Sequence, residues 1–470
     1  MSGPTTLEGL DAHALLDAYR AGTTSPVEVA EALLARIERL EPRLGAWCLL
    51  DPDTTLAQAR ESEQRWHAGA PRGRLDGVPV AVKDVFLTRG WPTLRGSVLT
   101  DPAGPWEVDA PAVAALRRHD AVLLGKTTTP ELGWKAVTDA PPTGVTRNPW
   151  DPTRTPGGSS GGSAAALAAR CAPLALGTDG GGSIRIPAGF TGTVGHKPTW
   201  GRVPHWPPSP YGPLAHAGPM ARTVADTALL LDVLAEPDVR DPGALLPDGV
   251  DHVAALEGGV AGLRIASSPT LGFAEVAPDV AAAVAGAVVT LADLGAHVEE
   301  VDPGFADPLP AWETIWHTGA AQATAHHDEA ARARMDPGLQ RIVDDGRARS
   351  AVDHLDAQAA RAALAVQMGL FHQRYDLLVT PTLPLTAFAA GVDVPEGWPD
   401  DRWPTWTPFS YPFNLTQQPA VSVPCGFGAD GLPVGLQIVG ARGADALVLR
   451  AARAYEEAHP VGEAVPPGLD

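Results

Sequence analysis

Apolar residues near the start of the chain recur at helical spacing. They repeat every three or four positions from Val29 to Leu40, which places them on one face of a helix. Residues 25–28 supply a start signal, because a serine is followed by a proline and, three positions after the serine, by a glutamate. Pro42 is expected to stop the pattern, so the sequence predicts a helical segment over about residues 7–42.

Farther along, short apolar runs alternate with helical stretches. Residues 77–85 predict a strand buried on both faces, because three valines alternate there and their neighbours are also apolar. A helical stretch at 110–116 and a second short strand at 121–125 follow. This β-α-β order favours an α/β fold.

The same rhythm continues to the end of the chain. Helices are predicted at 163–170 and 280–294, and further strands at 174–176, 262–266, 297–301, 376–380, 420–424 and 434–439. Residues 311–363 are mostly helical, and no internal repeat or linker divides the chain. We therefore expect one α/β domain over residues 1–470, with a helical excursion at about 305–370.

Composition narrows the classes of partner. The chain carries 35 lysines and arginines against 55 aspartates and glutamates, a formal net charge of −20. Such a charge works against binding to nucleic acid or to an anionic membrane surface. We expect a small-molecule partner, with neither nucleic acid nor membrane bound, and we leave open whether the protein forms a homodimer.

The cysteines and the apolar stretches bear on location. Cys48, Cys171 and Cys425 are far apart in the sequence and form neither a disulfide framework nor a zinc-binding spacing. Residues 1–10 lack a basic segment followed by an apolar run, and no apolar stretch reaches the 18 or so residues that a membrane span needs. The sequence therefore predicts a cytoplasmic protein without a transmembrane helix.

The candidate chemistry lies in a glycine-rich block over residues 156–198. Two serines framed by glycines, Ser159 and Ser183, stand 24 positions apart in it. The three glycines before Ser183 allow backbone angles closed to other residues, so successive N–H groups can converge on an oxyanion. Taken alone, either glycine run would equally suit a flexible loop or an anion-binding nest.

Other serine-hydrolase patterns fit less well. Residues 157–161 satisfy G-x-S-x-G, the nucleophile elbow, which would make Ser159 the nucleophile. That elbow needs a strand directly before the serine, whereas residues 148–156 contain three prolines. No serine is followed by lysine in an S-x-x-K pattern, and no Walker phosphate loop is present.

With these motifs in place, the chain resembles the amidase signature family over nearly its whole length. The resemblance rests first on GVPVAVKD at 77–84, GGSSGGS at 157–163 and GTDGGGSIRIPA at 177–188. It extends to TPELG at 129–133, GHKPTWGRVP at 195–204, GPMARTVAD at 218–226, and NLTQQPAVSVPCG with GLPVGLQ within 414–437. It implies a mixed central β-sheet covered by helices on both faces.

The resemblance also implies a catalytic triad. Ser183 would be the nucleophile, Ser159 the bridging serine in a cis peptide, and Lys83 the base. The chemistry of the residues agrees, because a serine needs an adjacent base and a lysine buried on an apolar strand can lose its proton by desolvation. The alternative for Lys83 is a surface lysine paired with Asp84, but neighbouring strand residues point to opposite faces.

The residues around the triad receive supporting roles. We expect the N–H groups of Gly180, Gly181, Gly182 and Ser183 to form an oxyanion hole. The resemblance suggests that Asp179 and Arg185 form a buried pair, and Ser160 and Thr178 are expected to orient the core by hydrogen bonds. The implied reaction is the hydrolysis of small linear aryl or alkyl amides through an acyl-enzyme, without metal or cofactor.

Two segments rich in aromatic residues, 312–316 and 398–413, are candidates for substrate selection. The candidate substrate-binding residues are Gly133, Trp134, Trp316, Trp403, Trp406 and Phe409. The alternative is that these tryptophans pack a loop against the body. We interpret His326 and His327 as surface residues of an alanine-rich helix, with no ligand role.

Two other functions remain open within the family. The amidase subunit of a glutamine-dependent tRNA amidotransferase is disfavoured, because that subunit usually carries S-x-D just before the G-P of GPMAR, used on glutamine. This chain has proline, leucine and alanine at residues 213–215. Hydrolysis of carbamates, nylon-type oligomers or esters on the same triad is the second alternative.

Overall fold

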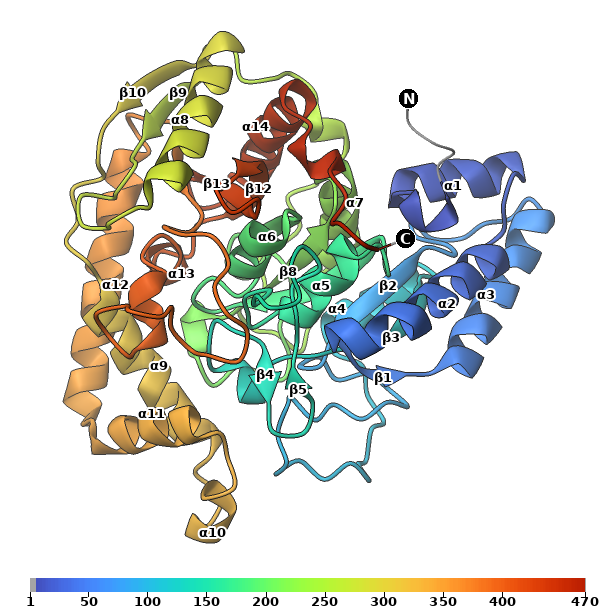
Figure 1. Ribbon diagram of the computed structural model, residues 1–470, viewed down its shortest axis with the longest axis horizontal. Helices are drawn as coiled ribbons and strands as arrows, with labels where there is room; N and C mark the ends of the chain where they lie inside the picture. The colour runs from blue at the N-terminus through green and yellow to red at the C-terminus, as the bar shows by residue number, and fades with distance from the viewer. Residues whose placement is uncertain (1–5, 470) are drawn as a thin grey trace.

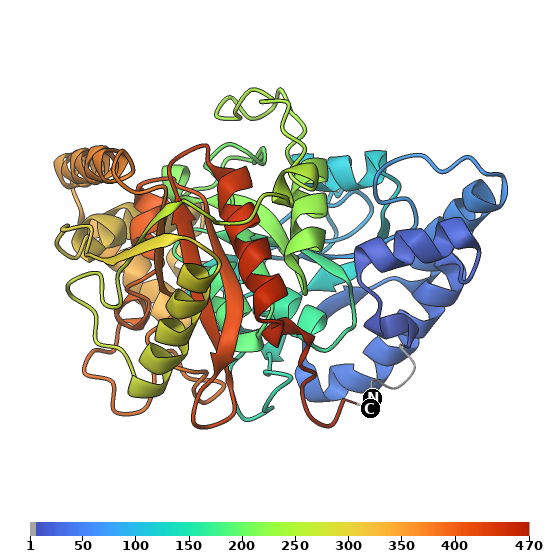
Figure 2. The same ribbon diagram turned by 90° about the horizontal axis from the view of Figure 1, so that it is seen from above.

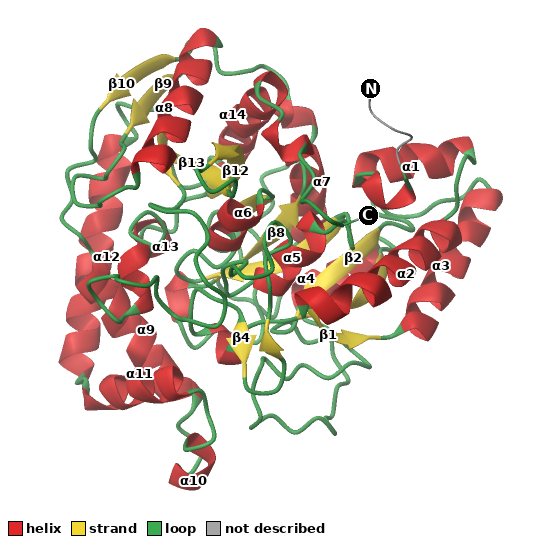
Figure 3. Cartoon of the chain, in the orientation of Figure 1, coloured by secondary structure: helices red, strands yellow, loops and turns green. Residues whose placement is uncertain are grey.

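One mixed sheet runs through the molecule in the computed structural model, which describes residues 6–469 (Figures 1 and 3). In sheet order its eleven strands are β1 (Trp47–Leu50), β3 (Val122–Thr127), β2 (Pro79–Lys83), β6 (Leu174–Asp179), β8 (His216–Ala221), β7 (Val194–Lys197), β12 (Ala420–Phe427), β13 (Pro433–Gly440), β11 (Leu377–Pro381), β9 (Arg264–Ser267) and β10 (His297–Glu300). A separate pair of strands, β4 (Asp139–Ala140) and β5 (Gly144–Val145), lies outside this sheet.

Helices surround the sheet. They are α1 (Ala12–Ala21), α2 (Pro26–Leu44), α3 (Pro52–His67), α4 (Pro111–Arg118), α5 (Gly161–Ala168), α6 (Arg185–Thr191), α7 (Val224–Leu234), α8 (Pro278–Asp293), α9 (Leu309–Ala323), α10 (Glu329–Arg332), α11 (Pro337–Ala348), α12 (Ala351–Phe371), α13 (Tyr411–Leu415) and α14 (Asp445–Ala458). Short 3₁₀ turns are η1 (Leu7–Gly9), η2 (Glu131–Gly133), η3 (Gly212–Leu214), η4 (Ala254–Leu256), η5 (Trp403–Trp406) and η6 (Val461–Glu463).

Strand β2 shows how the apolar pattern builds both layers. Val80 and Val82 join the apolar cluster formed with α4, α7, α8 and α14, whereas Ala81 joins the cluster formed with α2 and α5. Successive strand residues point to opposite faces, so a continuous apolar run is what a strand covered on both faces requires. The predicted α/β fold with helices on both faces is confirmed.

The β-α-β unit predicted from the sequence is present. Strand β2 pairs in parallel with β3, and α4 connects them. Strand β2 also pairs in parallel with β6, which places it inside the sheet with Lys83 at its end. The pairings of β6 with β8 and of β12 with β13 are antiparallel, so the sheet is mixed.

The two glycine-framed serines precede two helices of the same layer. Ser160 is the residue before α5, and the loop from the end of β6 passes Ser183 before α6 begins. The backbone N–H of Ser160 donates a hydrogen bond to the carbonyl oxygen of Ser183 at 3.1 Å. The fold therefore joins two loops that lie far apart in the sequence.

The N-terminal helices and the helical excursion at about residues 305–370 lie at opposite ends of the molecule. Figures 1 and 2 show α1, α2 and α3 at one end and α9, α11 and α12 at the other. The prediction that Pro42 ends its helix is wrong, because α2 continues to Leu44 and ends at the left-handed Gly45. A proline so close to the end removes a single intrahelical hydrogen bond, which the helix tolerates. Within residues 6–469, every helix is too short or too polar to span a lipid bilayer.

We predict that Ser25→Ala lowers the free energy of unfolding by about 1 kcal/mol, because it removes a capping box. The Ser25 hydroxyl accepts a hydrogen bond from the Glu28 N–H at 3.3 Å, and the Glu28 carboxylate accepts one from the Ser25 N–H at 2.9 Å. Urea denaturation measures the loss, with Ser25→Gly as the milder control. Equal stability of Ser25→Ala and wild type would contradict the prediction.

Candidate active site

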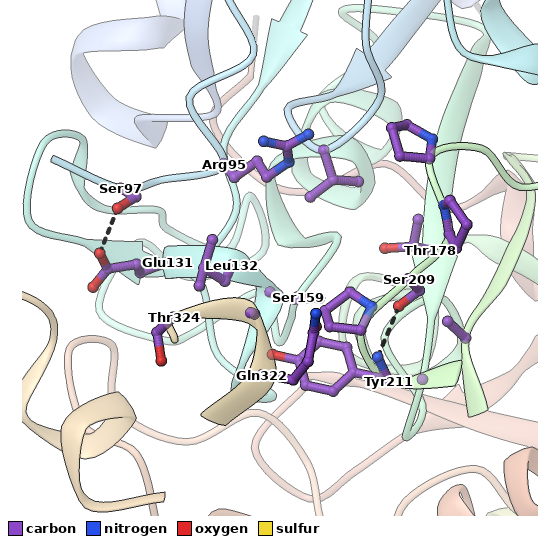
Figure 4. A pocket seen from close by; sticks show the side chains of 18 of the residues that line it. Arg95, Ser97, Glu131, Leu132, Ser159, Thr178, Ser209, Tyr211, Gln322 and Thr324 are labelled. Atoms are coloured by element: carbon purple, nitrogen blue, oxygen red, sulfur yellow. Dashed lines mark hydrogen bonds between the residues drawn. The ribbon is translucent and has the colours of Figure 1, made fainter. Parts of the chain in front are cut away.

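A cavity of about 590 Å³ opens above the two serine loops (Figure 4). Ser159 and Ser183 both line it, and so do Thr178, Gly180 and Gly133. Both serine side chains are almost fully buried from bulk solvent. The structure therefore brings the predicted nucleophile and the predicted bridging serine to one enclosed space.

Lys83 lies beneath this space, at the end of β2. Its side chain is fully buried, and its Nζ lies within hydrogen-bond distance of three hydroxyl oxygens, Ser159 Oγ at 2.8 Å, Ser160 Oγ at 2.9 Å and Thr178 Oγ1 at 2.9 Å. All three groups are neutral hydroxyls. Ser160 and Thr178, which the sequence analysis named as supporting residues, thus contact the amine directly.

The pKa of Lys83 is lowered well below the ordinary lysine value, because burial disfavours the charged form. The carboxylate of Asp179 opposes this lowering at longer range. Asp84 is turned away and lies 3.2 Å from the amine of Lys126. The interpretation of Lys83 as a surface lysine paired with Asp84 is therefore wrong.

The loop that carries Ser159 is tightly enclosed. A Cβ on Gly158 would lie 2.6 Å from the backbone of Val137, and the Gly158–Ser159 peptide bond is cis. A Cβ on Gly133 would lie 3.2 Å from Ser159 Oγ, so the turn at η2 closes over this hydroxyl. Residues 155–158 form no strand, which rules out the nucleophile elbow at Ser159.

The three glycines before Ser183 are required for two different reasons. Only Gly182 has a left-handed backbone, with φ of +121°. A Cβ on Gly180 would lie 2.7 Å from the ring of Trp316, and a Cβ on Gly181 would lie 2.7 Å from the ring of Trp312. The sequence analysis attributed all three glycines to backbone angles, whereas two of them are required by close packing against tryptophan.

The predicted oxyanion hole needs one correction. The N–H of Gly182 donates to Asp179 Oδ1 at 2.8 Å, so it is already used within the protein. The N–H groups of Gly180, Gly181 and Ser183 find no acceptor among residues 6–469. These three donors are the ones that the loop can offer to a ligand.

Asp179 and Arg185 form a fully buried ion pair. The guanidinium donates to the carboxylate through Nη2 and Nε, both at 2.9 Å, and it also reaches Gln437 Oε1 at 2.7 Å and Asn414 Oδ1 at 2.7 Å. Although burial alone would raise it, the pKa of Asp179 lies well below its ordinary value, because Arg185 stabilises the charged form. Sequence reasoning missed Asn414 and Gln437, although both stand in motifs quoted for the family resemblance.

Trp316 and Gly133 line the cavity as predicted, but the other aromatic candidates do not. Trp316 stacks on Tyr211 with ring centroids 3.6 Å apart and forms one wall. The candidates that pack instead in the surrounding apolar core are Trp134, Trp403, Trp406 and Phe409. Trp406, for example, is fully buried and stacks on Phe190 at 5.8 Å. Large apolar side chains gain more from full burial in the core than from lining a partly hydrated cavity.

His326 is exposed and His327 partly exposed, as the sequence interpretation expected, but the expected helix is absent at both residues. They lie in the turn between α9 and α10, not within a helix, and both border the cavity. The helix ends before them because Thr324 bonds back to Ala320 and Asp328 caps the next helix. Within residues 6–469, no group of three or more His, Cys, Asp or Glu side chains is placed to hold a metal ion.

Four further lining residues have no signal in the apolar pattern. Arg95, Leu132, Tyr211 and Gln322 reach the cavity from four separate segments (Figure 4). Arg95 and Tyr211 belong to loops without periodicity, so only the tertiary structure places them beside the serines. An arginine in such a loop is otherwise expected to be a surface residue.

Known proteins share this architecture. A family model described as Amidase matches residues 28–449. An acylamidase of Rhodococcus erythropolis is 38% identical over 473 residues, which cover 98% of each chain. A glutamyl-tRNA(Gln) amidotransferase subunit of Chloroflexus aurantiacus is 38% identical, over 96% of this chain and 97% of that one. A solved bacterial aryl acylamidase of the amidase signature family superimposes with a TM-score of 0.90 at 33% identity, over 99% of both chains.

The mixed sheet, the enclosed serine loops and these matches define an amide-hydrolysing enzyme. The chain belongs to the amidase signature family, which confirms the resemblance found in the sequence.

We predict that Trp406→Ala lowers the free energy of unfolding by about 3–5 kcal/mol, because it leaves a cavity in the core. The KM for an amide substrate should stay unchanged in the folded protein, since Trp406 does not line the cavity. Trp316→Ala is the comparison and should raise KM. Denaturant titration and steady-state kinetics measure both effects, and a raised KM without lost stability in Trp406→Ala would contradict this placement.

Proposed function

We propose that this protein is a serine hydrolase that cleaves the C–N bond of small linear aryl or alkyl acylamides. One observation carries the proposal: Lys83 is fully buried and bonds three neutral hydroxyls, and one of these, on Ser159, shares a cavity with Ser183. A lysine with a lowered pKa provides the lone pair that a serine relay needs.

In the proposed mechanism, neutral Lys83 takes the proton of Ser159, and Ser159 takes the proton of Ser183. The Ser183 oxygen then attacks the amide carbonyl, and a tetrahedral intermediate forms. Ser159 gives its proton to the leaving amine and takes one back from Lys83, which leaves a neutral Lys83 and an acyl-enzyme on Ser183. Water hydrolyses that ester through the same relay in reverse, so the enzyme ends as it began.

The negative oxygen of the intermediate requires donors that are free in the resting protein. The N–H groups of Gly180, Gly181 and Ser183 meet that requirement among residues 6–469. Loss of one such donor typically costs about 2.7–4 kcal/mol of transition-state stabilisation. The Asp179–Arg185 pair holds this loop through the Gly182 N–H and the backbone of α6.

The choice of substrate class rests on the cavity and on the relatives. The stacked rings of Trp316 and Tyr211 provide an apolar wall beside Gly180 and suit an aryl or alkyl group. The related proteins include an acylamidase and an aryl acylamidase. These observations support a stand-alone amidase of small acylamides.

The amidotransferase alternative is less well supported by the cavity, although several relatives and one solved structure are subunits of such enzymes. Ala215 lines the cavity at the position where S-x-D would place its carboxylate, so no acid stands there to hold the amino group of glutamine. Hydrolysis of carbamates, nylon-type oligomers or esters by the same triad remains a prediction. The homodimer and the cytoplasmic location also remain predictions. A panel of p-nitroanilides, aliphatic amides, urethanes and nylon-type oligomers, with glutamine as control, distinguishes these activities.

We predict that Ser183→Ala, Ser159→Ala and Lys83→Ala each lower kcat/KM by about a thousandfold or more, because all three belong to one relay. The losses in kcat/KM should not add. A double variant should therefore have about the same kcat/KM as the less active of its two single variants. Kinetics on a responsive p-nitroanilide, together with circular dichroism to verify the fold, measure this.

A fluorophosphonate probe supplies a second measurement for the same variants. It should label one peptide, which contains Ser183, and Ser183→Ala should lose the label. Ser350→Ala, at the exposed start of α12, is the matched control and should react normally. Wild-type turnover in Ser183→Ala, or labelling at Ser159, would refute the assignment.

We also predict that kcat/KM rises toward alkaline pH with one main ionisation, that of Lys83. Lys83 acts as a base only when neutral, and its lowered pKa moves the rise to a pH below the ordinary lysine value of 10.5. A pH–rate profile measures the limb, and Lys83→Met is the control for residual activity. If the rise in kcat/KM is centred at the ordinary lysine pKa, or if it persists in Lys83→Met, Lys83 is not the base.

A further inference from the structure

Arg95 brings a positive charge into the wall of the active-site cavity. Its backbone is fixed at two points, because its N–H donates to Asp84 Oδ2 at 2.9 Å and its carbonyl accepts from the Leu132 N–H at 2.7 Å. The residue has a left-handed backbone with φ of +56°. The loop therefore holds Arg95 in a defined position beside the turn that closes over Ser159.

The guanidinium of Arg95 forms no hydrogen bond or ion pair with any of residues 6–469, and no dashed line reaches it in Figure 4. The nearby carboxylates are engaged elsewhere. Asp84 pairs with Lys126, and the Glu131 carboxylate accepts from Ser97 Oγ and from the Asp336 N–H, both at 2.6 Å. Asp179, the other acid that lines the cavity, belongs to the buried pair with Arg185.

Arg95 is also the single arginine or lysine among the described residues that line this cavity. Burial lowers its pKa from the ordinary value, but a guanidinium remains charged in proteins. Three histidines also line the cavity, His205, His326 and His327, and burial lowers the pKa of His205 and of His327, which favours their neutral forms. The permanent positive charge of the cavity wall is therefore concentrated at Arg95.

The Arg95 side chain is half-buried, so its five N–H donors face the cavity without a protein partner and are available to a ligand. A carboxylate satisfies the guanidinium best, because the two planar groups can form two parallel bonds. We propose that Arg95 is a specificity-determining residue that receives a carboxylate on the substrate, remote from the scissile amide. This inference rests on the proposed function and adds to it: the preferred acylamides are anionic.

The geometry of the cavity supports such a substrate. Arg95 bonds to Leu132, and the next residue, Gly133, lies against Ser159 Oγ. The stacked rings of Tyr211 and Trp316 form an apolar wall of the same cavity. A substrate with an apolar group beside its amide and an acid at one end would fill both environments.

Two pairs of matched anilides test the proposal and distinguish the two ends of the substrate. Succinanilate against butyranilide places the carboxylate on the acyl side, and 4-acetamidobenzoate against acetanilide places it on the amine side. The expected result is that kcat/KM for one acid exceeds that for its neutral twin by about tenfold or more. In Arg95→Gln that ratio should fall to about one.

Arg89→Gln is the matched control, because Arg89 is an exposed arginine of the same loop and its loss changes the net charge equally. It should leave the ratio of acid to neutral twin unchanged. Arg95→Lys, which keeps the charge, should retain part of the preference, and thermal denaturation verifies that each variant is folded. A preference that persists in folded Arg95→Gln, or equal rates for acids and twins in wild type, would overturn the proposal.

A binding measurement tests the role of Arg95 independently of the proposed hydrolytic activity. Calorimetry on Ser183→Ala measures the Kd of both acids and both neutral twins without turnover. If no anilide is hydrolysed but one acid binds more tightly than its twin, and Arg95→Gln in the same background abolishes the difference, the proposed function fails and the role of Arg95 stands. Equal binding of acid and twin, or no binding of either acid, overturns the role of Arg95.

Discussion

The buried ion pair between Asp179 and Arg185 organises the part of the molecule where the chemistry is proposed. Asp179 is the last residue of β6, and its carboxylate accepts a hydrogen bond from the Gly182 N–H. Arg185 is the first residue of α6, and its guanidinium donates hydrogen bonds to the side chains of Asn414 and Gln437. Two charges without access to water require this full set of partners, because an unpaired buried charge would cost several kcal/mol. The pair thereby joins the nucleophile loop to β13 and α13, elements that lie more than two hundred residues away in the sequence.

The cavity beside this pair has two kinds of wall. Tryptophan rings lie so close to Gly180 and Gly181 that neither position has room for a side chain. On another wall, the Arg95 guanidinium forms no hydrogen bond with any of residues 6–469, and we propose that a substrate carboxylate binds it. Related proteins of this fold include an acylamidase and part of an amidotransferase. Because these relatives share the fold, we expect their differences of substrate to arise in the cavity lining, to which Ala215 belongs.

Much of the architecture and the core of the site could be predicted from the sequence. The apolar run before Lys83 predicts a strand covered on both faces, and helical spacing predicts α2 and α8. The glycine-framed serines and that lysine stand in motifs that resemble the amidase signature family, and further motifs over nearly the whole chain extend the resemblance. These signals are local: each depends on side-chain periodicity or on backbone freedom within about a dozen residues.

The remaining features depended on contacts between distant segments. Asp179 decides which N–H groups of the glycine loop are free, because its carboxylate already accepts a hydrogen bond from the Gly182 N–H. Which aromatic residues line the cavity was decided by packing: Trp316 reaches it while Trp406 fills the core. Arg95 carries no local signal, since a loop arginine is usually solvated. The sequence by itself determined most of the elements and the candidate reactive groups. The tertiary structure decided the partners of these groups, because burial and hydrogen bonding are settled only when separate segments meet.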